Sequence, residues 1–413
     1  MDEVGTRRFD LAALLAAVEA VPPVEAVDVL ARQLAKRVGA TDVSLLIANF
    51  SGDAVVRMSH VTADGETRDG HNERAESLPL PGSPYEHVLQ HQEELKVREV
   101  ADGWQLLVPV TERGDAIGIL EMTLRQAPDE EVIDYIGAAA HALAYVLIAS
   151  RRHTDLFEWA QRDTPFSLAA EIQRRLLPSA YTVEGGPFTV AGWLEPAANV
   201  GGDTFDYSVD REYLYASLTD AMGHSTTAAM LATIAVGSLR NTRRSMASPA
   251  EQATAVNRAL LECSDADQFV TGLVVRICLA NGTLEVVNAG HPPPLLLRSG
   301  HGATLEFRPD TPFGVIDFEP TTHRVSLEPG DRLVLVTDGF LERNAVEVDI
   351  TSTLLECQKR HARELVRELS NKVLLATGGD LRDDAAVLCI DWLGPSGSRD
   401  ATAGASRARA TRN

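Results

Sequence analysis

Four aspartates, each at a glycine turn or at one end of an expected strand, are the residues of this sequence best suited to chemistry. Asp220 follows the apolar run 213–218, and Asp338 follows the apolar run 333–336. A strand this apolar is expected to be buried, so its terminal carboxylate lies at the edge of the core, where a charge needs a partner. The other two members of the set are Asp203 and Asp383.

A cluster of these acids would carry an uncompensated negative charge. Two carboxylates ~4 Å apart repel by about 4 kcal/mol at an effective dielectric constant of roughly 20. Without a cation they would take up protons or destabilise the fold. Hard divalent ions such as Mg²⁺ and Mn²⁺ prefer oxygen ligands, and Gly201, Gly202 and Gly223 let a backbone carbonyl approach as a further ligand. A single aspartate is more commonly a turn or capping residue, but four in such positions favour a metal site.

Two histidines accompany the acids. His224 directly follows Gly223 and is either a general acid that protonates a leaving oxygen or a capping or supporting residue. His291 lies in a proline-rich turn and is expected to be structural. Ser225 is a good N-cap for the helix expected over residues 225–240.

Composition restricts the classes of function. The 413 residues carry a formal net charge of −21, which argues against nucleic acid or an anionic membrane as a partner. The four cysteines have no CxxC spacing and are expected to be buried free thiols in a reducing cytoplasm. No signal peptide is expected, and the most apolar window, 136–149, contains His141 and is shorter than the ~20 residues that span a bilayer.

The pattern of elements predicts an α+β protein with several parts. Residues 1–22 form an N-terminal helix, and residues 23–150 form a first domain. The elements expected within that domain are helix 24–38, strands 43–48 and 54–59, helix 83–90, a hairpin of 104–110 with 116–124, and helix 129–150.

Residues 151–178 are expected to form a helical linker, kinked at Pro165 and ended by Pro178. The linker is either a solvated connection or the place where helices of two subunits pair. Apolar stripes favour a homodimer: Leu168, Ile172 and Leu176, with Leu143, Val146 and Leu147 upstream. Residues 179–393 alternate many short strands with helices near 225–240, 249–264 and 362–375, a pattern typical of a β-sandwich flanked by helices. The tail 394–413 is expected to be disordered.

Six ordered motifs carry a resemblance over residues 168–392. They are AEIQRRLLP (170–178), VGGD (200–203), DAMGH (220–224), NAGHPPP (288–294), TDG (337–339) and DD (383–384). In order and spacing they resemble the SpoIIE/RsbU-type phosphatases, the bacterial branch of the PPM (protein phosphatase 2C-like) serine/threonine phosphatases, whose fold is a layered α-β-β-α sandwich.

The element order of residues 20–150 resembles a GAF domain, with a PAS-like or other small α+β domain as the alternative.

The resemblance implies a role for each site residue. Asp220 would be shared by two Mn²⁺ or Mg²⁺ ions, with the Ala221 carbonyl as a further ligand and Asp338 and Asp383 completing the set. Asp203 would bind metal or orient its water. Hydrolysis would then proceed without a covalent phosphoenzyme. Ser225 replaces a glycine usual in the family, and Thr204 replaces an aromatic residue, which bears on the fit of the substrate more than on the metal acids.

The expected function is a cytoplasmic metal-dependent phosphatase under control of the GAF-like domain, which would receive a small-molecule or protein signal. Its typical substrate in the family is a phosphorylated STAS-type anti-sigma factor antagonist. The first alternative is a non-catalytic scaffold that binds a phosphoprotein. The second, based on the GAF resemblance alone, is a nucleotide-binding sensor that acts on cyclic nucleotides.

Overall fold

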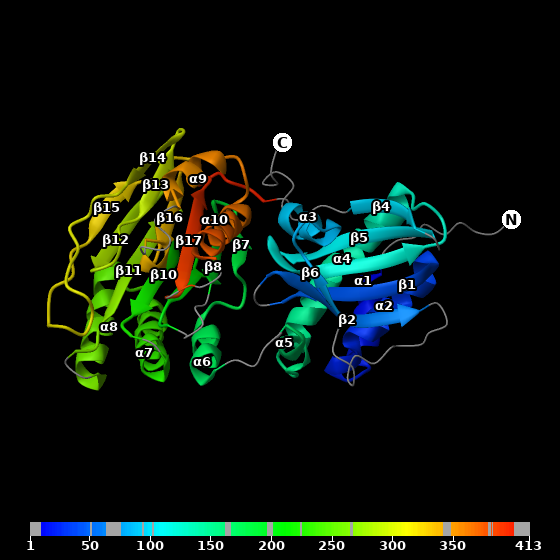
Figure 1. Cartoon of the computed structure of the whole chain (residues 1–413), viewed down its shortest axis with the longest axis horizontal. Coiled ribbons are helices and arrows are strands. Elements are labelled where there is room, and N and C mark those ends of the chain that lie inside the picture. The colour runs from blue at the N-terminus through cyan, green and yellow to red at the C-terminus, as the bar shows by residue number, and fades with distance from the viewer. Residues whose placement is uncertain are drawn as a thin grey trace. The chain divides into compact units, whose positions relative to one another are not determined.

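The computed structural model describes residues 10–49, 52–62, 76–92, 95–100, 103–161, 167–195, 201–223, 225–264, 267–341, 348–378, 381 and 383–399. These residues divide into two compact units, one within the first 165 residues and the other over residues 166–399. Figure 1 shows the helices and strands of each unit, and each unit has its own hydrophobic core.

The first unit is built on one antiparallel six-stranded sheet with the strand order β3-β2-β1-β6-β5-β4. The strands are β1 (Ala40–Ala48), β2 (Ala54–Thr62), β3 (Ser77–Pro79), β4 (Leu95–Val100), β5 (Gly103–Glu112) and β6 (Asp115–Leu124). Helices α1 (Leu11–Glu19), α2 (Ala26–Val38) and α4 (Glu130–Ser150) share a core with one face of the sheet. Helix α3 (Pro84–His91) packs on the other face through Val88.

Local signals in the sequence explain where these elements end. Helix α2 stops at Gly39, which adopts the left-handed conformation with φ 73°. The β5–β6 hairpin turns at Arg113 and Gly114, both with positive φ, as a two-residue hairpin turn requires. The predicted helix, two strands, short helix, hairpin and closing helix are all present in that order, and β3 and β4 are two further strands that were not predicted.

Helix α4 is, within the described ranges, the one helix long and apolar enough to cross a membrane by length and composition. Of its most apolar window, 56% is buried inside the unit. Leu143, Val146 and Leu147, which the sequence offered for pairing with a second subunit, are among these buried residues and belong to the core of the first unit.

The second unit contains two antiparallel sheets. The first has the order β15-β12-β11-β10-β9, and the second has the order β14-β13-β16-β17-β8-β7. The strands are β7 (Thr182–Glu184), β8 (Phe188–Glu195), β9 (Thr204–Val209), β10 (Tyr213–Ala221), β11 (Val270–Cys278), β12 (Thr283–Ala289), β13 (Leu295–Arg298), β14 (His301–Thr304), β15 (His323–Ser326), β16 (Arg332–Val336) and β17 (Ala385–Trp392).

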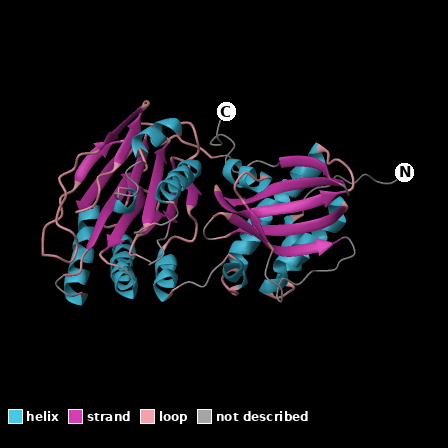
Figure 2. Ribbon diagram, viewed as in Figure 1, coloured by secondary structure: helices cyan, strands magenta, loops and turns pink. Residues whose placement is uncertain are grey.

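Because side chains alternate between the two faces of each strand, the second unit has three hydrophobic layers: one between the sheets and one under each pair of helices. Leu218 and Leu388 point between the two sheets. Val274 packs under helices α7 (Ser225–Arg243) and α8 (Pro249–Cys263), which cover the first sheet. Val387 packs under helices α9 (Ile350–Glu356) and α10 (Ala362–Thr377), which cover the second sheet. The unit is thus an α-β-β-α sandwich, as predicted (Figure 2).

The linker is less continuous than expected. After α4 the chain forms α5 (Leu156–Ala160) and α6 (Leu168–Leu176), and Pro165 lies outside the described residues. Of the apolar stripe on α6, Leu168 is 68% exposed, whereas Ile172 and Leu176 are partly buried against the cores of their own unit. The stripe therefore offers one exposed apolar side chain rather than three.

The tail was expected to be disordered from Gly394 onward. Residues 394–397 instead form a turn, in which Gly397 N donates to Gly394 O. Beyond this turn, Arg399 Nε lies 3.1 Å from a carboxylate oxygen of buried Glu184. This buried ion pair holds the segment against the second unit. Residues 400–413 lie outside the described part of the chain.

We expect Ser248→Ala to destabilise the protein by about 1 kcal/mol. Ser248 begins α8 with a capping box: its Oγ accepts a hydrogen bond from Glu251 N, and the Glu251 carboxylate accepts one from Ser248 N. Thermal unfolding of the second unit should shift down by a few degrees. Ser248→Asp keeps a capping oxygen and should unfold near the wild-type temperature; equal losses in both variants would contradict the capping role.

Candidate functional site

The predicted acids lie at matching ends of strands from both sheets. Asp203 immediately precedes β9, and Asp220 is near the end of the antiparallel neighbour β10, where Thr219 pairs with Thr204. In the other sheet, Asp338 follows β16, and Asp383 precedes its antiparallel neighbour β17. These acids are up to 180 residues apart in the chain, and the topology places them at one end of the sandwich.

Asp203 joins the two sheets. Its side chain is buried, and its Oδ2 accepts a 2.6 Å hydrogen bond from Oγ1 of Thr337 at the end of β16. The same Thr337 Oγ1 accepts from Ala386 N of β17 at 2.9 Å. These two hydrogen bonds fix the orientation of the buried Asp203 carboxylate, whereas Asp220 and Asp338 are more accessible to solvent.

Asp384 is a further acid of this cluster that the predicted set of site residues omitted. It is completely buried, and its Oδ2 accepts hydrogen bonds from Gly201 N at 3.1 Å and from Gln173 Nε2 at 2.5 Å. Strand alternation could have identified it. Side chains alternate between the two faces of a strand. Asp384 is four residues from Leu388 and is therefore on the face that points between the sheets. Asp383 is four residues from Val387 and is on the face that points toward the helices.

Gln173 ties helix α6 to the cluster. Besides Asp384, its Nε2 donates to the backbone carbonyl of Asp203 at 2.8 Å, and its side chain is 2% exposed. One amide on the helix that leads into the second unit therefore contacts both acid-bearing segments. Gln173 belongs to the motif at 170–178, but the sequence alone predicts no contact for its side chain.

The two glycines before Asp203 are required by close packing. A Cβ on Gly201 would lie 2.9 Å from Asp383 Oδ1 and 3.0 Å from Asp384 Oδ2. A Cβ on Gly202 would lie 2.5 Å from the carbonyl oxygen of Ala221. Any larger residue would push the Asp203 turn away from these oxygens. The Ala221 carbonyl, predicted as a ligand, thus lies at the same turn as Asp203.

Like charges dominate the electrostatics. Burial first, and then the charges of Asp220 and Asp384, raise the pKa of Asp203 well above its usual range. Burial, followed by the charges of Asp338 and Asp383, raises the pKa of Asp220 to about 7. Each acid is thus destabilised as an anion by its neighbours, which is the situation that a bound cation relieves.

The donor set fits a hard divalent ion. Carboxylates and one carbonyl are the ligands that Mg²⁺ and Mn²⁺ prefer, and Asp220, Asp338 and Asp383 are all accessible to solvent, unlike Asp203 and Asp384. In the ranges that the structure describes, no three acidic, histidine or cysteine side chains already surround a single point as a ligand set would. The accessible acids would have to close around an ion when it binds.

Of the two histidines singled out in the sequence, only His291 lies within the described residues. His224 lies outside the described residues, and α7 begins at the next residue, Ser225. His291 is buried, and its Nδ1 lies 2.9 Å from Thr271 Oγ1. Its backbone N donates a hydrogen bond to Asn288 Oδ1, and its backbone carbonyl accepts one from Asn288 Nδ2. Burial lowers the pKa of His291 to about 3, so it stays neutral, in keeping with the structural role expected for it.

We expect the metal-free protein to lose stability as the pH rises from about 4 to about 7. The pKa of Asp220 is about 7 in the fold and 3.8 in the unfolded chain, so the folded state holds a proton that the unfolded state has released. The contribution of this proton to the free energy of unfolding is complete below about pH 4 and disappears as the pH rises through about 7. The free energy of unfolding falls by at most ~1.4 kcal/mol per pH unit in this range.

Thermal unfolding in a chelator at several pH values measures this loss. Asp220→Asn removes the titrating group and should flatten the profile, and Mn²⁺ should restore wild-type stability at pH 8. A wild-type profile as flat as that of the variant would contradict the coupling among the acids.

Residues 210–393 match the family model for stage II sporulation protein E (SpoIIE). The chain is 24% identical over 214 residues to the phosphoserine phosphatase RsbP of Bacillus subtilis, covering 50% of this chain and 51% of RsbP. It is 22% identical over 241 residues to the phosphoserine phosphatase RsbU of Bacillus subtilis, covering 54% of this chain and 68% of RsbU. The chain therefore spans about half the length of RsbP and two thirds of RsbU.

Solved structures similar to this chain include the RsbU and RsbW domains of a Mycobacterium tuberculosis protein, at 23% identity and a TM-score of 0.46, covering 52% of this chain and 63% of that one. The PP2C domain of SiaA from Pseudomonas aeruginosa is similar at 20% identity and a TM-score of 0.47, covering 54% of this chain and 94% of that one. From the family match and the two curated relatives, we conclude that the second unit carries a phosphatase domain of the SpoIIE family, a PPM-type hydrolase domain homologous to those of RsbU and RsbP.

Proposed function

We propose that this protein is a metal-dependent phosphatase that removes phosphate from serine or threonine of another protein. The observation that carries the proposal is the convergence of five acids at one end of the sandwich, in a domain homologous to phosphoserine phosphatases. Burial, and then the charges of neighbouring carboxylates, raise the pKa values of two of them, Asp203 and Asp220. A cluster of this kind has little structural value, because each added charge destabilises the others.

In this proposal Asp220, Asp338, Asp383 and the Ala221 carbonyl hold two Mn²⁺ or Mg²⁺ ions. Bound ions of this kind neutralise charge on a phosphoryl group and make water a better nucleophile. Asp203, oriented by its hydrogen bond from Thr337, would bind metal or position the attacking water. We also propose that His224 protonates the leaving serine or threonine oxygen.

The proposed substrate is a phosphorylated STAS-type protein in the cytoplasm, an antagonist of an anti-sigma factor. Support comes from the names of RsbU and RsbP as phosphoserine phosphatases and from the family resemblance. The sequence contains no recognisable STAS segment, so we propose that the substrate is a separate protein.

We further propose that the first unit is a GAF-like sensor that controls the phosphatase through α6. The antiparallel sheet between helices supports the sensor assignment, and the hydrogen bonds of Gln173 provide a route by which a displacement of α6 reaches Asp203 and Asp384. A homodimer through the linker helices stays a proposal, with exposed Leu168 as its main support.

The test is phosphate release from each phosphorylated STAS protein of the same genome, with purified full-length protein and Mn²⁺. We expect release from one such protein and little from an unrelated phosphoserine peptide. Release from none of them would contradict the proposed substrate class.

A specific observation keeps the non-catalytic scaffold as a second candidate: the acids of the described segments do not yet form a closed ligand set. If the scaffold is correct, the protein binds a phosphoprotein but takes up no metal and releases no phosphate.

A further inference from the structure

A cavity of about 480 Å³ lies far from the acidic cluster, at the other end of strand β10. Tyr215, which lines it, precedes Asp220 by five residues, or about 17 Å along a strand. Tyr215 pairs with Ser208 of β9, and both side chains face the helical side of the sheet, where the last turns of α7 cover them. The cavity is therefore separate from the proposed metal site and within the size range of small-molecule sites.

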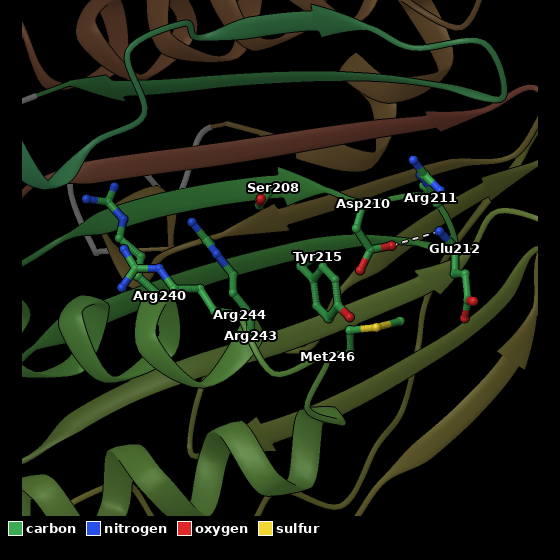
Figure 3. Close-up of a pocket in the computed structure, with 9 residues that line it drawn as sticks. All are labelled: Ser208, Asp210, Arg211, Glu212, Tyr215, Arg240, Arg243, Arg244 and Met246. Atoms are coloured by element: carbon green, nitrogen blue, oxygen red, sulfur yellow. Dashed lines mark hydrogen bonds between the residues drawn. The ribbon is translucent and has the colours of Figure 1, made fainter.

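Three arginines gather at one end of this cavity. Arg240 and Arg243 come from the last turn of α7, Arg244 directly follows that helix, and Figure 3 shows all three on one side of Tyr215. In a chain with a net charge of −21, such a concentration of cations is unusual. Three guanidinium groups within five residues of the chain are an arrangement suited to phosphate, because each presents a planar set of donors.

Only part of this positive charge is neutralised within the fold. Arg240 Nε and Arg243 Nη1 lie 2.9 Å and 2.7 Å from the same oxygen of buried Asp206, so two cations share one carboxylate. The exposed Arg244 side chain makes no ion pair or hydrogen bond with the described residues. The arginine end thus keeps an excess of positive charge.

The middle of the cavity offers an unused hydroxyl. Tyr215 is 3% exposed, and its Oη has no well-formed hydrogen bond among the residues that the structure describes. Burial and the nearby charge of Asp210 raise its pKa, so the hydroxyl remains a donor at neutral pH. A buried polar group without a partner costs free energy, which a ligand oxygen would recover.

The opposite end is acidic. Asp210 and Glu212 lie beyond Tyr215 in Figure 3, beside Arg211. Asp210 Oδ1 already accepts from the backbone of the β9–β10 turn, whereas Glu212 is exposed to solvent. Carboxylates here would accept hydrogen bonds from hydroxyl or amino groups of a ligand whose anionic end lies at the arginines.

We propose that this cavity binds a phosphate-bearing small molecule, with its phosphate at Arg243, Arg244 and the Tyr215 hydroxyl and its hydroxyl or amino groups toward Glu212. A nucleoside diphosphate has this distribution of charge and donors. The proposal does not depend on the phosphatase activity, because it concerns a different face of the sheet.

The test is isothermal titration of the full-length protein with pyrophosphate and with ADP in excess chelator, so that no metal at the acidic cluster can bind phosphate. We expect saturable binding of one molecule per chain, tighter for ADP than for pyrophosphate. Arg244→Gln and Tyr215→Phe should each weaken it about tenfold or more. Neither substitution removes an ion pair or hydrogen bond of the described fold.

The matched control is Arg258→Gln, which removes an exposed arginine from the neighbouring helix α8 outside the cavity. It should leave the affinity within about twofold. Absence of saturable binding, equal losses in Arg258→Gln and Arg244→Gln, or binding of a phosphoserine peptide without binding of either small probe would overturn the proposal.

Discussion

Replacing Asp220 with asparagine is expected to lower the rate of metal-dependent phosphate release by roughly a thousandfold, equivalent to about 4 kcal/mol of transition-state stabilisation. Asp220 is the acid whose charge is opposed by both Asp338 and Asp383, so it lies at the centre of the proposed ligand set. An amide keeps the shape of the side chain but supplies no negative charge to hold a cation. Phosphate release at saturating Mn²⁺ measures the effect.

The loss should occur without unfolding. Because Asp220 is destabilised by its neighbours in the metal-free protein, Asp220→Asn should unfold at the same temperature as wild type or at a higher one. Asp317→Asn, at an exposed acid in a loop, is the matched control and should retain full activity. Full activity in both Asp220→Asn and Asp338→Asn would contradict the assignment of these acids.

Replacing Gln173 with alanine is expected to lower activity by roughly 10- to 100-fold, the range seen when a residue that orients metal ligands is removed. The substitution breaks two hydrogen bonds, to the Asp203 carbonyl and to Asp384. It leaves two buried acceptors each with one partner fewer, which should also cost about 1–3 kcal/mol of stability.

The apparent affinity for Mn²⁺ distinguishes this role from general destabilisation. If Gln173 positions the acids, Gln173→Ala should need more Mn²⁺ for half-maximal activity at a temperature where the variant is fully folded. Arg175→Gln, at an exposed residue of the same helix whose partner is Glu171, should change neither quantity. An unchanged Mn²⁺ requirement in Gln173→Ala would refute the positioning role.

Much of the site could be predicted because its signals are local. Asp220 and Asp338 each end an apolar run, and that pattern alone places a carboxylate at the edge of a buried sheet. The hairpin at Arg113 and Gly114 and the end of α2 at Gly39 were predictable for the same reason. These features depend only on neighbouring residues.

What could not be predicted depends on contacts between distant segments. Gln173 and Asp384 are 211 residues apart, and no local pattern indicates that their side chains meet. The apolar stripe of α6 was read as a subunit interface, but Ile172 and Leu176 pack into their own unit because α6 lies against α7. The cavity at Tyr215 likewise exists only where the last turns of α7 meet β9 and β10.

The most direct test of the central claim, that the acids form a divalent metal site, is titration of the metal-free protein with Mn²⁺ by calorimetry. We predict binding of two ions per wild-type chain, with weaker binding and fewer ions in Asp220→Asn and Asp338→Asn and no change in Asp317→Asn. No detectable binding by the folded wild-type protein, or identical binding by all four proteins, would contradict the claim and favour the non-catalytic scaffold.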